Sequence, residues 1–243
     1  IATLDVITDG RIVMGLGIGY AQTEFDAFGV DRRTRTDRFE EAVELIRALW
    51  TGKPVTHHGK FYKLDDVETS TLPVQSPSPP IWIGAQAEAS VRRAARLADA
   101  WYVPPFPTHR ELLALYVMYL EERALAGRAG SSAIPVRREL FLANTVSEAE
   151  NAVAAGASSR YGTYSEWGLD LDDGLGSKQW LDNRFLLGDG ETVAAGIAHL
   201  AEHIEYSEFV YKPQWPGQDH VHAMAQLERF GTEVVPLLNP LTD

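Results

Sequence analysis

The segment with the clearest capacity for ligand chemistry is residues 79–86, with the sequence Pro-Pro-Ile-Trp-Ile-Gly-Ala-Gln. A short apolar run that ends in a glycine and leads into a helix, here over 88–98, is typical of a buried strand followed by a helix start. At such a corner, backbone N–H groups and the positive end of the helix dipole can bind a phosphate group. The pattern therefore predicts a phosphate site.

A second candidate region is the β-branched, glycine-rich run over 11–19, which is typical of a buried strand. Gly15, Gly17 and Gly19 recur at every second residue. Two interpretations stay open: the glycines make room for a ligand at the strand end, or they allow tight backbone packing. A dinucleotide-binding fingerprint does not fit, because no helix start with a third glycine follows.

The histidines give no metal-binding pattern that we favour. His57 and His58 are adjacent, so in a strand their side chains point to opposite faces and cannot chelate one metal together. His199 and His203 are four residues apart on a predicted helix, a spacing that can bind a metal. Without the glutamate pattern of a zinc protease, we favour an exposed helical face and predict no metal site.

Composition limits the class of protein. The chain has 243 residues, 45% of them hydrophobic, a net charge of −12 and no cysteine. The charge argues against a nucleic acid or a membrane surface as partner, since both attract clustered cations. We expect a cytoplasmic protein, because neither a signal peptide nor a long apolar run is evident. The chain begins with Ile1 and mid-domain sequence, so we expect that an N-terminal portion is missing.

The elements that must position these residues alternate along the chain. Five predicted strands, each followed by a helix, cover residues 11–19, 81–84, 100–104, 136–143 and 208–212. Between them lie a hairpin over 55–64 and a polar, aromatic-dotted segment over 158–183, which is either a lid over a site or a surface insertion.

Three helix starts are predicted from capping patterns: Asp37 with Glu40, Thr108 with Glu111 for a helix that ends near Ala126, and Ser147 with Glu150 for an alanine-rich helix that ends near Ala157. The alternation as a whole predicts an α/β protein with a parallel sheet and right-handed crossovers. The sheet is either open and doubly wound or the last five-eighths of an eight-stranded barrel. In both architectures ligands bind at the C-terminal ends of the strands.

An ordered set of short motifs carries a resemblance to a known family. The motifs occupy residues 4–11, 15–19, 24–25, 28–29, 49–52, 59–62, 79–84, 98–101 and 214–217. Together they resemble the bacterial luciferase-like flavin-dependent monooxygenases, from the first residue to about Pro236. Each motif alone is weakly specific, and their order along the chain makes the set specific.

The resemblance implies a TIM-type (β/α)8 barrel with insertions that binds reduced FMN or the deazaflavin F420. The chain then corresponds to strands 4 to 8 of the family order, as a single partial barrel domain over 1–243. The family's first three βα units precede a segment like residues 3–11, so the resemblance implies that this N-terminal third is absent. Catalytic residues from those strands are therefore unknown here.

The resemblance also assigns cofactor-binding residues. The family corner that receives the flavin phosphate falls on Gly84, Ala85 and Gln86, with Ser90 in the first helical turn. Luciferases proper carry a glutamate-serine pair at this corner and a basic residue after the preceding strand. This chain has Ala85-Gln86 and Ile18 instead, which weighs against light emission.

The implied reaction is the oxygenation of a small organic substrate with reduced FMN and O2, the flavin being supplied by a flavin reductase. Tyr20, Trp101, Gln214 and Trp215 are the candidates for lining the pocket, although each also suits aromatic packing at a barrel rim. A homodimer is expected. An F420-dependent oxidoreductase, which transfers hydride, and a non-catalytic flavin-binding or scaffold protein remain as alternatives. An aldolase-type barrel would need a lysine at a strand end, for which Lys212 is the candidate.

Overall fold

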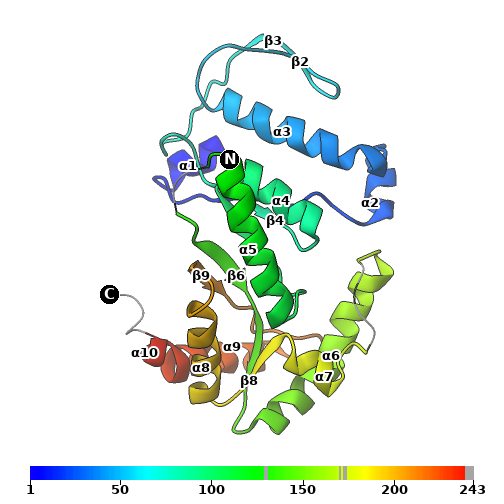
Figure 1. Ribbon diagram of the computed structural model, residues 1–243, viewed down its shortest axis with the longest axis vertical. Helices are drawn as coiled ribbons and strands as arrows, with labels where there is room; N and C mark the ends of the chain where they lie inside the picture. Colours follow the sequence, from blue (N-terminus) through cyan, green and yellow to red (C-terminus); the bar gives the residue numbers. More distant parts are fainter. Residues whose placement is uncertain (129–130, 170, 172–173, 239–243) are drawn as a thin grey trace. The chain divides into compact units, whose positions relative to one another are not determined.

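The computed structural model describes residues 1–128, 131–169, 171 and 174–238 (Figure 1). Its internal contacts divide the chain into two compact units. The first unit comprises Ile1–Tyr102 and Glu121–Ala129, and the second comprises Val103–Leu120 and Gly130–Asp243. Helix α5 (His109–Leu125) contributes residues to both.

The first unit is built on a parallel sheet in the order β1-β4-β5. Its strands are β1 (Met14–Leu16), β4 (Ile81–Gly84) and β5 (Ala100–Tyr102). β1 is shorter than the run over 11–19 suggested, because only three of its residues pair with β4. Since all three strands run in one direction, their C-terminal ends lie at one edge of the sheet.

Helix α4 (Glu88–Leu97) packs against β4 and β5. It is close to the helix expected over 88–98. Its apolar face consists of residues with no exposed surface, spaced three and four apart as a core-facing helix requires: Val91, Ala94, Ala95 and Ala98.

Helix α3 (Arg35–Leu49) contacts α4 and the hairpin strand β2 (Val55–His58), which pairs antiparallel with β3 (Lys63–Val67) (Figure 1). The hairpin prediction is confirmed. The unit also contains helices α1 (Ala2–Ile7) and α2 (Gln22–Ala27) and the 3₁₀ turn η1 (Arg32–Thr34).

The predicted capping start of α3 at Asp37 is wrong. The helix begins at Arg35, and no side chain caps it. Glu40, the expected capping partner, instead forms an ion pair with Arg93 of α4 at 2.7 Å, and Asp37 binds Lys60 at 2.8 Å. Both carboxylates that the local pattern assigned to the helix cap instead form ion pairs with residues of other elements.

Asp99 holds the opposite end of the sheet. Its carboxylate accepts hydrogen bonds from the Ile81 amide at 2.8 Å, from Arg47 at 2.9 Å and from Arg128 at 3.2 Å. The side chain thus joins the start of β4 to α3 and to the segment after α5. This role explains the aspartate of the 98–101 motif in structural terms.

The second unit contains two pairs of parallel strands. β6 (Ile134–Arg137) pairs with β9 (Tyr206–Val210), and β7 (Glu139–Leu142) pairs with β8 (Phe185–Gly188). The single strand predicted over 136–143 is therefore interrupted at Arg138, where the chain changes its partner. β8 was absent from the predicted strands.

The helices of the second unit are α6 (Val146–Glu166), α7 (Lys178–Asp182), α8 (Gly190–Ala201), α9 (His220–Arg229) and α10 (Val235–Leu238), with the π-helical turn η2 (Phe230–Val234) between the last two. The irregular segment expected over 158–183 is largely helical, because α6 runs to Glu166 and α7 follows. The expected irregular conformation is therefore wrong for these two helices, whereas the choice between a lid and a surface insertion stays open. Residues 170, 172 and 173 of that segment lie outside the described residues.

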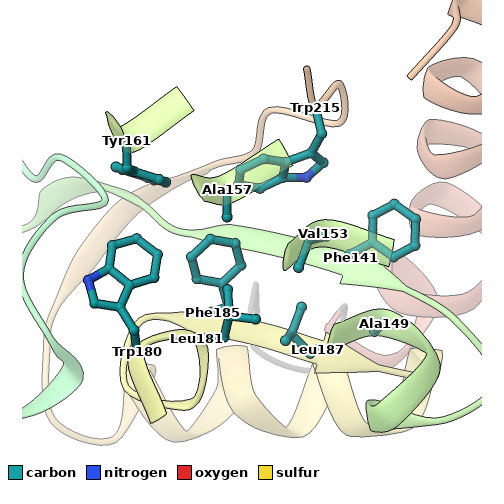
Figure 2. Packing of buried hydrophobic residues seen from close by; sticks show 10 residues of the cluster. All are labelled: Phe141, Ala149, Val153, Ala157, Tyr161, Trp180, Leu181, Phe185, Leu187 and Trp215. Atoms are coloured by element: carbon teal, nitrogen blue, oxygen red, sulfur yellow. The ribbon is translucent and has the colours of Figure 1, made fainter. Parts of the chain in front are cut away.

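An aromatic cluster explains why α6 continues. Tyr161 of α6 is fully buried and packs edge-on against Trp180 of α7, with ring centroids 4.8 Å apart. Phe185 of β8 stacks on Trp215 at 5.3 Å, and Figure 2 shows both beside Ala157 of α6. The burial of these rings outweighs the polar composition of the segment, since each aromatic side chain removes a large apolar area from water.

The described strands form one three-stranded and three two-stranded sheets, and these do not close into a barrel. In the part of the chain that the structure describes, no helix has the length and apolar character needed to cross a membrane.

Candidate functional site

The C-terminal half of the β1-β4-β5 sheet forms the wall of an apolar pocket in the first unit. Its volume is about 370 Å³, and it is lined by Val13, Gly15, Leu16, Trp82, Gly84 and Tyr102. A Cβ atom built on Gly15 or Gly17 would meet nothing within 4 Å. Open space over Gly15 and Gly17 favours room for a ligand there. Gly19 differs, because a Cβ atom on it would lie 3.0 Å from the Phe25 ring and its φ is +79°.

Gly84 ends β4 at the pocket. A Cβ atom there would lie 3.7 Å from the Leu16 carbonyl oxygen and 3.9 Å from the Tyr102 ring, both ordinary contact distances. The fold therefore tolerates a methyl group at this position. What the glycine provides is free space on the pocket side, which a longer side chain would fill.

Directly after Gly84, the start of helix α4 lacks a side-chain cap. Its N-cap residue is Ala87, which has an extended backbone and cannot accept a hydrogen bond through its side chain. The Ser90 amide bonds the Ala87 carbonyl at 2.9 Å, so the amides of Glu88 and Ala89 are the ones without an intrahelical acceptor. This end also carries the positive pole of the helix dipole. The arrangement can accept an anion.

The structure places the predicted phosphate residues together at this corner. Gly84, Ala85 and Gln86 are consecutive, and Ser90 lies in the first turn of α4, partly buried. Tyr20, also partly buried, follows β1 but is not among the pocket-lining residues. Their roles toward a cofactor stay predictions.

Trp101 is not a pocket residue, contrary to expectation. It pairs with Ile83 on β4, and both side chains are buried on the sheet face opposite Trp82 and Tyr102. Its indole N–H donates to the Ala85 carbonyl oxygen at 2.8 Å. The tryptophan thereby holds the corner in place from behind, since alternate residues of a strand point to opposite faces.

Trp215 is also a core residue. Only 1% of its surface is exposed, and the Arg160 guanidinium lies 4.0 Å from the ring centroid. Gln214, in contrast, is exposed, and its carbonyl oxygen accepts a hydrogen bond from Arg160 Nη2. Of this predicted pair, Trp215 anchors the segment after β9 and Gln214 alone remains accessible.

Sequence reasoning missed Trp82 and Tyr102 as pocket residues. A signal was present, because Trp82 alternates with the buried Ile81 and Ile83 along β4. The period of two in a strand assigns such a residue to the face opposite the core.

A sequence model of the luciferase-like monooxygenases matches residues 1–205. The chain belongs to this family. The prediction from the motifs is thus confirmed, and with it the assignment to a family of oxidoreductases.

Relatives of this luciferase-like chain use two kinds of cofactor according to their names. It is 35% identical over 105 residues to an FMNH2-dependent dimethylsulfone monooxygenase of Pseudomonas putida, a match that covers 42% of the chain and 29% of that relative. It is 37% identical over 103 residues to an F420-dependent glucose-6-phosphate dehydrogenase of Microbacterium testaceum, covering 41% and 30%. The matched part therefore spans less than a third of either relative.

Solved structures share the fold over nearly the whole luciferase-like chain. The monooxygenase RslO1 of Streptomyces bottropensis superposes with a TM-score of 0.79 at 22% identity, covering 97% of this chain and 71% of that one. An F420-dependent secondary alcohol dehydrogenase gives 0.75 at 19% identity, covering 98% and 72%. These similarities show the fold, which is that of the TIM-barrel family.

The second unit of the luciferase-like chain holds a charged cluster that the sequence did not reveal. Glu139 of β7 is fully buried. Its Oε1 accepts hydrogen bonds from Arg137 at 2.7 Å and from the Tyr161 hydroxyl at 2.8 Å, and Arg160 lies at 3.4 Å. Burial and the neighbouring Glu139 carboxylate raise the pKa of Tyr161, so it stays a hydrogen-bond donor.

The His199/His203 pair gains a third neighbour in the structure. Ligand atoms of His199, Glu202 and His203 lie within 4.8 Å of one another, and all three side chains are exposed. An exposed helical face is what the spacing led us to expect. That it binds no metal stays a prediction.

Proposed function

We propose that this chain binds reduced FMN in the first unit and uses it with O2 to oxygenate a small organic substrate. The observation that carries the proposal is the uncapped start of α4 directly beside a glycine-walled apolar pocket. A helix N-terminus binds phosphate, and an apolar pocket suits a flat aromatic ring. Both features lie at the C-terminal ends of parallel strands, where α/β folds bind ligands.

The residues present fit such a cofactor. The amides of Glu88 and Ala89 and the Ser90 hydroxyl are donors for a phosphate, and Gly84 leaves the backbone approachable. The pocket volume of about 370 Å³ lies within the range of small-molecule sites. Glu88 is exposed at the same helix end, so its negative charge opposes the phosphate. Binding therefore relies on amides and the dipole rather than on a cation.

When bound, the flavin supplies the electrons for the reaction with O2 or with the substrate. The role of the protein chain is to orient the flavin ring and to exclude water from it. Trp82 and Tyr102 provide large apolar surfaces for both tasks, since they form pocket walls. Tyr102 is the titratable side chain among the lining residues of this pocket.

An F420-dependent oxidoreductase that transfers hydride is the second candidate. The F420-dependent glucose-6-phosphate dehydrogenase favours this candidate, because its sequence identity to the chain, 37%, is close to the 35% of the FMNH2-dependent monooxygenase. A non-catalytic flavin-binding or scaffold protein is the third. A flavin reductase partner, a homodimer and a cytoplasmic location stay predictions from the sequence.

Binding and turnover measurements separate these candidates. The chain is titrated under anaerobic conditions with reduced FMN and with reduced F420, and O2 uptake is then followed with the cofactor that binds. FMN binding with O2 uptake supports the monooxygenase, and F420 binding without O2 uptake supports hydride transfer. If neither cofactor binds with a dissociation constant below about 100 µM, or about −5.5 kcal/mol, the catalytic proposals fail.

Gly84→Val tests the phosphate corner directly. The fold accepts a Cβ atom there, but the additional methyl groups enter the space next to the open amides. We expect at least a tenfold loss of flavin affinity, equal to about 1.4 kcal/mol. Gly162→Ala is the matched control, because a Cβ atom at this helical glycine also meets nothing within 4 Å. Unchanged affinity in Gly84→Val would overturn the assignment.

A further inference from the structure

Positive charge is in excess where β6 and β9 end in the second unit. Arg137 and Arg160 both contact Glu139, the one buried carboxylate of this cluster. Lys212, two residues after β9, is exposed and forms no ion pair with any described residue. Three cations therefore stand beside a single anion, so these four groups together carry a net positive charge.

Strand pairing and hydrogen bonds bring these groups to one place. In the β6–β9 ladder Arg137 lies opposite Val210, so Lys212 leaves the chain just beyond this pair. Arg160 Nη2 bonds the carbonyl oxygen of Gln214, and its guanidinium lies over the Trp215 ring at 4.0 Å. The segment after β9 is thus fastened to Arg160.

The electrostatic environment of Lys212 agrees with this geometry. Burial lowers the pKa of its ammonium group, repulsion from Arg160 and Arg137 lowers that pKa further, and Glu139 opposes the effect. Two buried donors of the same segment, the Tyr211 hydroxyl and the Trp215 indole N–H, have no acceptor. Within the cluster the second carboxylate oxygen of Glu139, Oε2, also has no hydrogen-bond partner, so the shortage of acceptors is confined to the segment after β9.

We infer that this cluster binds the carboxylate group of an organic acid. A carboxylate beside Lys212 would supply negative charge, with the Lys212 ammonium group as its hydrogen-bond donor; both Nη atoms of Arg160 are already bonded, so its guanidinium contributes charge at longer range. Carboxylate binding by this cluster does not depend on the function proposed above. The C-terminal ends of parallel strands are the expected place for a substrate.

A purely structural role explains only part of the cluster. Arg160 and Glu139 anchor the segment after β9 through Gln214, Trp215 and Tyr161. Lys212 takes no part in these contacts, so stability gives no reason for a lysine beside two arginines. Ligand binding supplies one.

The test uses glutarate, a dicarboxylate, and glutaramide, its neutral counterpart. Both are titrated into the full chain without flavin by isothermal calorimetry at low ionic strength. We expect saturable glutarate binding near or below about 1 mM, weakened by salt, and no measurable glutaramide binding. Lys212→Ala should weaken glutarate binding at least about tenfold, while Lys212→Arg should stay within about threefold of the wild type.

Lys178→Ala is the matched control, because it removes an exposed lysine of the same unit at a different place. It should leave glutarate affinity within about twofold. Equal affinity in Lys212→Ala and the wild type overturns the inference, as does equal binding of glutaramide. Inorganic phosphate that binds while glutarate does not overturns it too, because the site is then not one for carboxylates. A failure of flavin binding leaves these results unaffected and concerns the proposed function alone.

Discussion

The strand-to-helix corners of the two units differ in what fills the helix start. In the second unit the side chain of Thr145 caps α6, that of Asp189 caps α8 and that of Asp219 caps α9, each by accepting a hydrogen bond from the amide three residues on. In the first unit the corresponding residue of α4 is Ala87, and no side chain caps the helix.

Helices α1, α2 and α3 of the first unit also lack a side-chain cap, so the comparison is informative only where an uncapped start lies near a pocket. A capping oxygen satisfies an amide that would otherwise bind water or a ligand, and it occupies the place where an anion would lie. Its absence costs a helix about 1 kcal/mol. At α4 this cost coincides with an adjacent pocket walled by glycines, so the open amides have a ligand site beside them.

The two units also differ in how they use tryptophan. Trp215 of the second unit is enclosed by Phe185 and Arg160 and fills the core. Trp82 of the first unit is partly buried and forms a wall of the pocket. Trp101 of the first unit is buried as well, so the difference lies between Trp82, which borders a pocket, and the enclosed Trp215.

The largest effect expected is on stability, from truncating the enclosed ring. Trp215→Ala should lower the free energy of unfolding by about 3 to 5 kcal/mol, because the cavity cannot collapse around Phe185. Trp82→Ala should cost about 1 kcal/mol or less, since its ring is already partly exposed. Urea denaturation followed by circular dichroism measures both. Equal costs would remove the distinction between the two tryptophans.

A pH effect is expected at another filled corner, the start of α5. Thr108 and Glu111 form the predicted capping box there, with the Glu111 carboxylate accepting from the Thr108 amide at 2.7 Å. Burial, and then the nearby Arg138, lower the pKa of His109 to about 4. As the pH falls, His109 is therefore protonated near pH 6.5 in the unfolded chain but only near pH 4 in the folded chain.

The sign of the pH effect follows from this order. As the pH falls from about 6.5 to about 4, the His109 contribution should lower stability by about 2 to 3 kcal/mol, and no further below pH 4. In His109→Gln this part of the pH dependence should disappear. Urea midpoints between pH 4 and pH 7 provide the measurement. A variant with the same slope as the wild type would show that His109 is not held neutral.

Local patterns in the sequence were sufficient where one element decides its own structure. The apolar spacing of Val91, Ala94 and Ala95 predicted α4, and the box of Thr108 and Glu111 predicted the start of α5. The family motifs predicted the family itself. In each case the interactions that matter lie within a few residues.

The sequence was insufficient where distant contacts decide. The cap of α6 is Thr145 rather than Ser147, and the helix continues past Ala157 because Tyr161 packs on Trp180. An aromatic residue at a strand end can face a pocket or the core, and only tertiary packing placed Trp215 in the core. Buried charges such as Glu139 show no signal in an apolar strand pattern.

A smaller effect concerns flavin affinity at the open corner. In Ala87→Asp the carboxylate should cap the Ala89 or Ser90 amide and repel a phosphate. We expect a loss of FMN affinity of at least tenfold, or about 1.4 kcal/mol, together with a more stable fold. Fluorescence titration measures the first and thermal unfolding the second. Undiminished FMN affinity in a stabilised variant would mean that the phosphate binds elsewhere.

The smallest effects come from exchanging the caps of the two units. Thr145→Ala removes the side chain that accepts from the Glu148 amide at 3.2 Å and should cost about 1 kcal/mol of stability without changing FMN affinity. Ala87→Thr adds the same group to α4, whose N-cap backbone is already extended as capping requires, and should gain up to about 1 kcal/mol while FMN affinity falls. One variant removes a helix cap and the other adds one to the same protein. Opposite changes in stability would therefore not arise from differences in expression or purity. If Ala87→Thr gained stability and kept its FMN affinity, α4 would be an ordinary helix start that happens to lack a cap.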